Sequence, residues 1–209
     1  MRKEKLQTLY IHWGMTFKNN DDYLFYLNNK VISLDVKNSW DWDYLKEQLI
    51  NDCTIIKPRM PLQDNAKYSE WKVIFEKYLD KLNNDIILMG SSLGWVFLAK
   101  YLSENKVDKN IVSVYMICPP FDNTLIGEDL VGWFELQNNL SMIESQSNNI
   151  KLLFSKDDEV IPISHASKYQ DKLPNSEIII YESKNWHFKI QEFPEIITMI
   201  KKDIESIIQ

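Results

Sequence analysis

The chain has 209 residues, of which 44% are hydrophobic and 12% aromatic, and its formal net charge is −6. A chain of this size and composition can bury one sizeable core, so we expect a single domain over residues 1–209. The acidic balance argues against a protein that mainly grips nucleic acid or anionic lipid, because both need clustered cationic side chains.

Neither a targeting segment nor a membrane span is expected. The first residues, MRKEKLQTLYIHW, hold too short an apolar run for a signal peptide, and no run approaches the roughly 20 apolar residues that cross a bilayer. Cys53 and Cys118 lie in or at the end of strand-like runs, which favours two buried free thiols over a disulfide. We therefore expect a cytoplasmic protein.

Short apolar runs alternate with amphipathic stretches along the chain. Seven runs are predicted to be strands: LQTLYIH (6–12), KVISLD (30–35), CTIIKP (53–58), DIILMG (85–90), IVSVYMIC (111–118), IKLLFS (150–155) and SEIIIYE (176–182). Several are unbroken runs of Ile, Val and Leu, which is typical of strands buried on both faces.

The intervals between these runs show helical periodicity. One apolar stripe within residues 66–82 consists of Tyr68, Trp71, Phe75, Tyr78 and Leu82. The C-terminal stretch 193–208 repeats isoleucines at steps of three and four, with Pro194 suited to a first helical turn. Strands alternating with helices predict an α/β fold, a three-layer α/β/α sandwich around a mainly parallel sheet. The longest interval, 119–149, is a candidate excursion that covers a site.

A serine flanked by glycines follows the fourth apolar run. The segment Gly90-Ser91-Ser92-Leu93-Gly94 lies between a predicted strand and a predicted helix, which is the context of a G-x-S-x-G nucleophile elbow. Small residues are needed at both ends because the chain packs against itself there. Ser92 is the predicted nucleophile, since it alone has glycine at both two-residue offsets.

Two alternatives to a nucleophile elbow exist for this segment. Gly90 and Gly94 would also allow close packing of a helix on a strand without any chemistry. A phosphate-binding loop is excluded because no Gly-Lys-Ser/Thr sequence follows.

A serine needs a base, and the chain has three histidines. His187 follows the last predicted strand, so it should lie at the same sheet edge as Ser92, and we predict it to be the base. His165 lies in a helical stretch and is expected to be a surface or capping residue. His12 ends the first strand and is expected to make a structural hydrogen bond across loops.

The acid should follow the run IKLLFS, in the sequence SKDDEVIP. Asp157 and Asp158 are both candidates, and Asp158 is preferred because it forms the pattern D-x-x-x-P with Pro162. The chain order Ser92, Asp158, His187 matches that of α/β-hydrolases.

The oxyanion hole is expected to use two backbone N–H groups. One comes from Leu93, at the start of the helix after the elbow. The other comes from Trp13 or Gly14, which directly follow the first strand, and the sequence leaves that choice open.

With these motifs in order, the chain resembles the small serine hydrolases of the α/β-hydrolase fold that are similar to retinoblastoma-binding protein nine. The resemblance spans nearly the whole chain. It rests on the loop 12–14, the Pro-x-x-Pro segment 58–61 with Trp71, the elbow 90–94, the acid loop 158–162 and the pair His187-Phe188. It implies a compact hydrolase with little or no cap that cleaves small esters or related acyl bonds.

The chain also departs from that family's pattern. Family members often carry glycine where this chain has Trp13, Trp95 and Trp186, and these tryptophans either line a tight aromatic pocket or pack into the core. Phe121 and Trp133 are further candidates for the pocket. The Leu-x-Cys-x-Glu signature for binding the retinoblastoma protein is absent, so that partner is not expected.

The resulting hypothesis is ester hydrolysis through an acyl-enzyme, with no metal or organic cofactor and a small acyl compound as substrate. Activity is expected to fall below roughly pH 6–7, as an ordinary histidine base becomes protonated. The alternatives are a catalytically silent binding protein of the same fold, and acyl transfer or thioester cleavage by the same triad.

Overall fold

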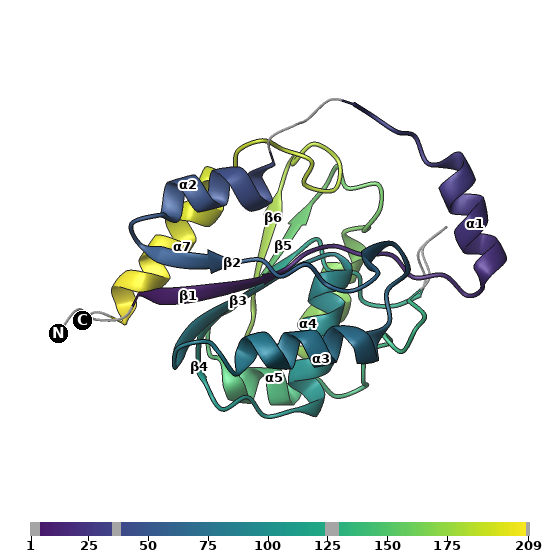
Figure 1. The fold of residues 1–209 in the computed structure, drawn as a ribbon. Coiled ribbons are helices and arrows are strands. Elements are labelled where there is room, and N and C mark those ends of the chain that lie inside the picture. Colours follow the sequence, from purple (N-terminus) through teal and green to yellow (C-terminus); the bar gives the residue numbers. More distant parts are fainter. Residues whose placement is uncertain (1–4, 35–38, 124–129, 208–209) are drawn as a thin grey trace.

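The computed structural model describes residues 5–34, 39–123 and 130–207. Within these residues, one parallel sheet has the strand order β2-β1-β3-β4-β5-β6 (Figure 1). Its strands are β1 (Leu6–Ile11), β2 (Cys53–Ile56), β3 (Asp85–Ser91), β4 (Asn110–Ile117), β5 (Ile150–Ser155) and β6 (Glu177–Tyr181). Six of the seven predicted strands are therefore confirmed.

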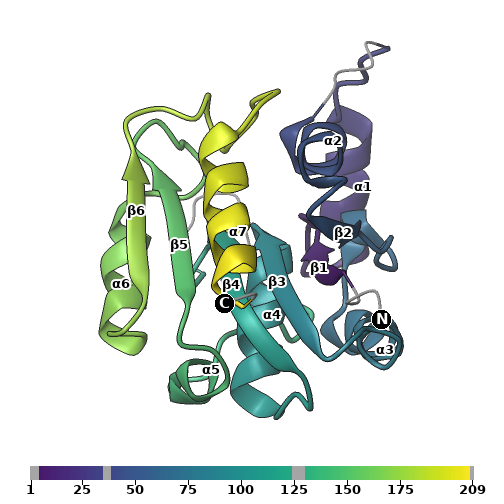
Figure 2. The same cartoon turned by 90° about the vertical axis from the view of Figure 1, so that its left-hand side faces the viewer.

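Helices cover both faces of the sheet, which confirms the three-layer α/β/α architecture. They are α1 (Asn20–Asn29), α2 (Leu45–Leu49), α3 (Tyr68–Leu79), α4 (Leu93–Glu104), α5 (Ser141–Gln146), α6 (Ser164–Lys172) and α7 (Pro194–Ser206). Helices α2 and α7 lie on one face, and α3, α4, α5 and α6 lie on the other (Figure 2). No helix among the described residues has the length and apolar character needed to cross a bilayer.

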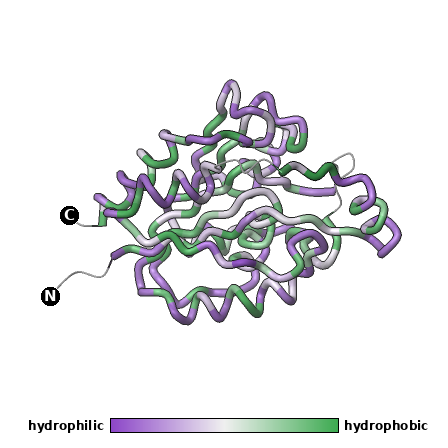
Figure 3. The backbone as a smooth tube through the Cα atoms, turned by 45° about the horizontal axis from the view of Figure 1, so that its top comes forward, coloured by the Kyte–Doolittle hydropathy of each residue, from purple (hydrophilic) through white to green (hydrophobic). Residues whose placement is uncertain are grey.

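The central strands carry the apolar core (Figure 3). In β3, Ile86, Ile87, Leu88 and Met89 are fully buried, because helices cover the sheet on both sides. An unbroken apolar run is the pattern that such a strand needs.

Two expectations from periodicity are wrong. The run KVISLD forms no strand over 30–34, and its Val31 and Leu34 are more than 90% exposed. This segment follows α1, which has no buried residue and stands away from the sheet, so no strand edge is there to pair with it (Figure 1). Asp35 lies outside the described residues. In α3 the buried stripe ends at Leu79, which leaves Tyr78 39% exposed.

The strand order reverses between β1 and β3. The chain passes from β1 outward to β2 and then returns to β3 on the other side of β1. Ligands in open α/β sheets bind at the carboxyl ends of strands next to such a reversal. The loop after β1 and the turn after β3 therefore meet at the place where a site is expected.

Glycines allow α4 to start directly above this reversal. A Cβ on Gly94 would lie 2.2 Å from the Ile11 carbonyl oxygen and 2.4 Å from that of His12. A Cβ on Gly90 would lie 2.7 Å from the backbone of Trp95. These separations leave no room for a side chain, so both glycines are required by close backbone packing.

Gly94→Ala should lower the free energy of unfolding by about 3 kcal/mol or more, because the new methyl group overlaps two backbone carbonyls that cannot move independently of β1. Urea unfolding monitored by circular dichroism measures the loss. Gly14→Ala serves as the control. Its Cβ would meet side-chain atoms of Trp71 and Leu93 at 2.8–3.0 Å, a smaller overlap than that of Gly94 with backbone at 2.2 Å, so the loss should be smaller. A Gly94→Ala protein as stable as the wild type would contradict this account.

Candidate active site

Ser92 occupies the turn between β3 and α4 in a strained conformation. Its φ of 50° and ψ of −124° lie outside the regions that side chains favour. The Ser92 N–H donates to the Ile117 carbonyl on β4 at 3.0 Å, and the Ser92 carbonyl accepts from the Trp95 N–H at 3.0 Å. These bonds and the two flanking glycines hold the half-buried serine at the carboxyl end of β3.

Asp158 and His187 form a hydrogen-bonded pair at the same edge of the sheet. His187 Nδ1 lies 3.1 and 3.0 Å from the two carboxylate oxygens of Asp158. Asp158 Oδ1 also accepts the N–H groups of Val160 and Ile161, and its side chain is almost fully buried. A carboxylate held in this way orients the imidazole and stabilises its protonated form.

Asp157, the other candidate acid, has a different position. Its carboxylate accepts the hydroxyls of Ser155 and Ser183 and the N–H groups of Lys184 and Trp186. These hydrogen bonds, led by that of Ser155, hold the pKa of Asp157 well below its usual range. Asp157 therefore organises the loop that carries His187 and does not contact the imidazole.

That loop turns in the left-handed sense. Asn185, Trp186, His187 and Phe188 have φ values between 45° and 55°, a region that non-glycine residues rarely occupy. The Lys189 N–H closes the turn on the carbonyls of Asn185 and Trp186. Strain of this kind persists only where surrounding contacts determine the conformation.

Aromatic packing supplies those contacts on the α7 face of the sheet. Phe188 is buried against Tyr181 and Phe193, with ring centroids 6.1 and 5.7 Å away. Trp40 packs on Phe193 and donates its indole N–H to the Phe188 carbonyl at 3.0 Å. The buried side chain of Phe188 thus holds the adjacent His187 in place.

The predicted triad also needs a hydrogen bond between its serine and its histidine. Within the described chain, no hydrogen bond joins Ser92 to His187, although both lie at the carboxyl edge of the sheet. His187 Nε2 instead lies 3.7 Å from the Sγ atom of Cys118, at the end of β4. Catalytic hydrogen bonds are often long or absent in proteins without substrate.

The surroundings of His187 change its titration. Burial by itself lowers the pKa of His187, but the charges and hydrogen bonds of Cys118 and Asp158 outweigh burial and raise that pKa to about 10. An imidazole in this setting is protonated at neutral pH. The expectation of an acid limb at pH 6–7 therefore does not fit the environment that the structure shows.

The same three residues include the ligand types of zinc sites. Cys118, Asp158 and His187 offer a sulfur, an oxygen and a nitrogen that lie within 4.8 Å of one another. Both oxygens of Asp158 are, however, already within hydrogen-bond distance of His187, and Oδ1 also accepts two backbone N–H groups. The arrangement therefore fits a carboxylate that orients a histidine better than it fits a metal ligand.

The loop after β1 is fixed by His12. His12 Nδ1 lies 2.6 Å from the Trp13 carbonyl oxygen, and the Met60 N–H donates to His12 Nε2 at 3.0 Å. This is the cross-loop hydrogen bond expected for His12, and burial lowers its pKa, so it stays neutral. Trp71 packs edge-on against His12 and donates its indole N–H to the Pro61 carbonyl at 2.7 Å.

This arrangement brings the backbone of Gly14 close to the side chain of Leu93. The Gly14 backbone is packed so closely that an added Cβ would lie 3.0 Å from the Leu93 side chain. Leu93 is the first residue of α4, so its N–H has no acceptor inside the helix. The choice between Trp13 and Gly14 as second donor stays a prediction.

The candidate pocket aromatics have different environments. Trp95 is fully buried and donates its indole N–H to the Tyr169 hydroxyl at 2.9 Å, so it belongs to the core between α4 and α6 and does not line a pocket. Trp13, Trp133 and Trp186 are 43%, 79% and 37% exposed. Phe121 packs edge-on against Tyr169.

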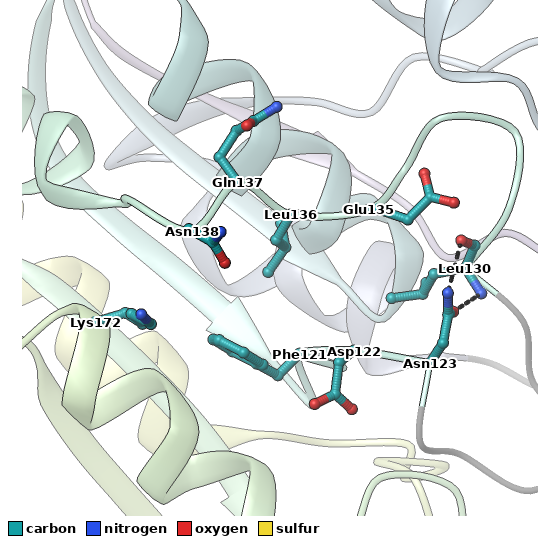
Figure 4. Close-up of a pocket in the computed structure, with 9 residues that line it drawn as sticks. All are labelled: Phe121, Asp122, Asn123, Leu130, Glu135, Leu136, Gln137, Asn138 and Lys172. Carbon is teal, nitrogen blue, oxygen red and sulfur yellow. Dashed lines mark hydrogen bonds between the residues drawn. The ribbon is translucent and has the colours of Figure 1, made fainter.

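The segment after β4 encloses a separate cavity of about 200 Å³ (Figure 4). Figure 4 shows its lining residues, which come from this segment and from α6: Phe121, Asp122, Asn123, Leu130, Glu135, Leu136, Gln137, Asn138 and Lys172. Ser92, Asp158 and His187 are not among them. The excursion predicted for 119–149 thus borders a cavity away from the proposed chemistry, and its residues 124–129 lie outside the described part of the chain.

His165 also differs from its expected role. It is buried, and its Nδ1 accepts the Phe121 N–H at 2.9 Å, so it ties α6 to the segment after β4.

Sequence reasoning missed the position of Cys118 as well. A signal was present, because Cys118 ends one predicted buried strand and Ser92 closely follows another, and the carboxyl ends of parallel strands meet at the same sheet edge.

The chain matches no family model, and a search of curated protein sequences finds no significant match. Solved structures are similar over almost its whole length. The ydeN gene product of B. subtilis has a TM-score of 0.73 at 15% identity, covering 96% of this chain and 100% of that chain. A putative YdeN-like hydrolase of Pectobacterium atrosepticum has a TM-score of 0.63 at 13% identity, covering 96% and 92%.

An esterase of Pyrococcus furiosus is also similar, with a TM-score of 0.57 at 15% identity, covering 97% of this chain and 83% of that chain. Identities this low establish architecture alone. Together with the parallel sheet and the strained turn at Ser92, these comparisons show that the chain has the α/β-hydrolase fold.

Proposed function

We propose that the protein is a serine hydrolase that cleaves small carboxylic esters or related acyl bonds. The observation that carries this proposal is the Asp158–His187 pair at the sheet edge where the strained Ser92 turn ends. The hydrolase and esterase names of structural neighbours support the reaction class. The ordered motifs also support a relation to the retinoblastoma-binding-protein-nine-like hydrolases, and the two free thiols support a cytoplasmic location.

In the proposed reaction, His187 takes the proton of Ser92 as the serine oxygen attacks the acyl carbon. Asp158 holds the imidazole through Nδ1 and stabilises its charged form. The N–H groups of Leu93 and of Trp13 or Gly14 hold the oxyanion. His187 then returns the proton to the leaving alcohol, and water releases the acyl group by the same route.

A second candidate is a binding protein that keeps the fold without turnover. It is favoured by the contact of His187 with Cys118 in place of Ser92. The difference between the two candidates is whether Ser92 is activated, and this can be measured without knowing the substrate.

A fluorophosphonate should add once to the wild-type protein, because an activated serine attacks phosphorus and displaces fluoride. Intact mass spectrometry measures the adduct. Ser92→Ala should show none, while Ser91→Ala, which changes the neighbouring serine, should react like the wild type. A folded wild-type protein that gains no adduct would reject the hydrolase in favour of the binding protein.

Asp158→Asn should lower kcat by roughly 10⁴-fold, since an amide cannot stabilise the imidazolium and favours the wrong tautomer. Asp157→Asn is the matched control and should cost less than about tenfold, because the hydrogen bonds of Asp157 go to Ser155 and to the loop around the base rather than to the imidazole. Steady-state hydrolysis of a short-chain nitrophenyl ester gives both values. Equal losses of kcat in the two variants would contradict the assignment of Asp158 as the acid.

The rate of hydrolysis should rise with pH through the alkaline range, because His187 must be neutral to accept a proton and its raised pKa keeps it protonated below that range. Cys118→Ala removes one of the two side chains that raise the pKa of His187, so its acid limb should move to lower pH. Profiles of kcat/KM between about pH 6 and pH 10 test this, and a wild-type midpoint at the ordinary histidine value would contradict it.

A further inference from the structure

Cys118 follows β4 at the sheet edge where the proposed nucleophile follows β3. The register of β3 and β4 ends with Ser91 paired to Ile117, and Ser92 and Cys118 are the next residues after this last pair. The Ser92 N–H donates to the Ile117 carbonyl at 3.0 Å, which holds the two chains together up to this point. A thiol and a hydroxyl therefore lie at the same sheet edge.

The thiol is not isolated. Its Sγ atom lies 3.7 Å from His187 Nε2, and Asp158 holds the other nitrogen of the same ring. Cys118, His187 and Asp158 thus form a chain of contacts from a nucleophilic atom to a base and then to an orienting acid, as in the cysteine variants of the catalytic triad. A protonated imidazole beside a thiol stabilises the reactive thiolate.

Cys53 provides an internal comparison. It is 3% exposed and Cys118 is 2% exposed, so burial does not distinguish the two thiols. Cys53 lies 3.6 Å from the Thr8 hydroxyl, and burial raises its pKa, which makes it inert. The difference between the cysteines is the His187–Asp158 pair.

We propose that Cys118 is a modification site for small sulfur electrophiles, and that a mixed disulfide at Cys118 blocks the hydrolase site. The second part rests on the function proposed above for Ser92. The modification places a new group against His187 Nε2, the nitrogen that would accept the proton of Ser92, so His187 cannot act as the base for the serine.

The reaction with methyl methanethiosulfonate illustrates the step. The Cys118 thiolate attacks the methylthio sulfur, a new S–S bond forms, and the S–SO₂ bond breaks. Methanesulfinate leaves with the bonding electrons, and His187 keeps its proton. A thiol such as dithiothreitol reverses the modification by exchange. Because Cys118 is so deeply buried, bulky aromatic disulfides should not react with the native protein.

The experiment compares single-cysteine proteins. Cys53→Ser retains Cys118, and Cys118→Ser retains Cys53. We expect native Cys53→Ser to gain one methylthio group at neutral pH at least tenfold faster than native Cys118→Ser, measured by intact mass. In urea both thiols should react alike, which shows that the native difference comes from the fold.

The second test substitutes His187, which contacts Cys118, and Asp158, which orients His187. In the Cys53→Ser background, His187→Gln and Asp158→Asn should each slow the modification of Cys118 at least tenfold, with folding checked by circular dichroism. An unchanged rate in both, or equal rates for the two cysteines in the native protein, would overturn the proposal.

The consequence for activity is measured separately. Ester hydrolysis by Cys53→Ser should fall in step with the adduct and return with dithiothreitol, whereas the hydrolysis that remains in Cys118→Ser should be insensitive to the reagent. If a fluorophosphonate does not label Ser92 but Cys118 still reacts, the hydrolase proposal fails and the thiol site stands. If Ser92 is labelled and Cys118 is inert, only the thiol site fails.

Discussion

The close approach of α4 to β1 is the constraint on which the rest of the site depends. Gly94 lies so near the carbonyls of Ile11 and His12 that no side chain fits between them. This approach brings the first turn of α4 to the loop after β1, at the point where the strand order reverses. The strained turn at Ser92 and the juxtaposition of Leu93 with Gly14 are both consequences of that packing.

Opposing electrostatic influences act on His187. Burial disfavours its charged form, while Asp158 and Cys118 favour it, and the second influence is the larger. A base with one acidic partner is common in hydrolase sites, but here a thiol lies against the other nitrogen of the ring. The site thus contains two potential nucleophiles and one base, and the protonation of His187 decides which of them is activated.

Much of the fold could be predicted from the sequence, because buried parallel strands need unbroken apolar runs and the connecting helices need apolar stripes. The run KVISLD failed because a strand also needs a free edge, which local pattern does not reveal. The turn at Ser92 could be predicted because glycine spacing is a local property, and the pairing of Asp158 with His187 because both residues follow neighbouring parallel strands. The burial of Trp95 and the contact of Cys118 with His187 depend on how helices and strands pack, and no single segment encodes them.

The left-handed turn that carries His187 lowers the stability of the folded protein. A residue other than glycine or asparagine in this conformation costs roughly 1–2 kcal/mol, so Trp186, His187 and Phe188 together hold on the order of 3–6 kcal/mol. A whole domain of this kind is typically stable by only about 5–15 kcal/mol. The core contacts of Phe188 and the hydrogen bonds of Asp157 must offset a sum of that size to keep the base in place. A chain selected for stability alone would have glycine in this turn, so the tryptophan and histidine found there mark a place where the fold gives up stability for the position of one ring.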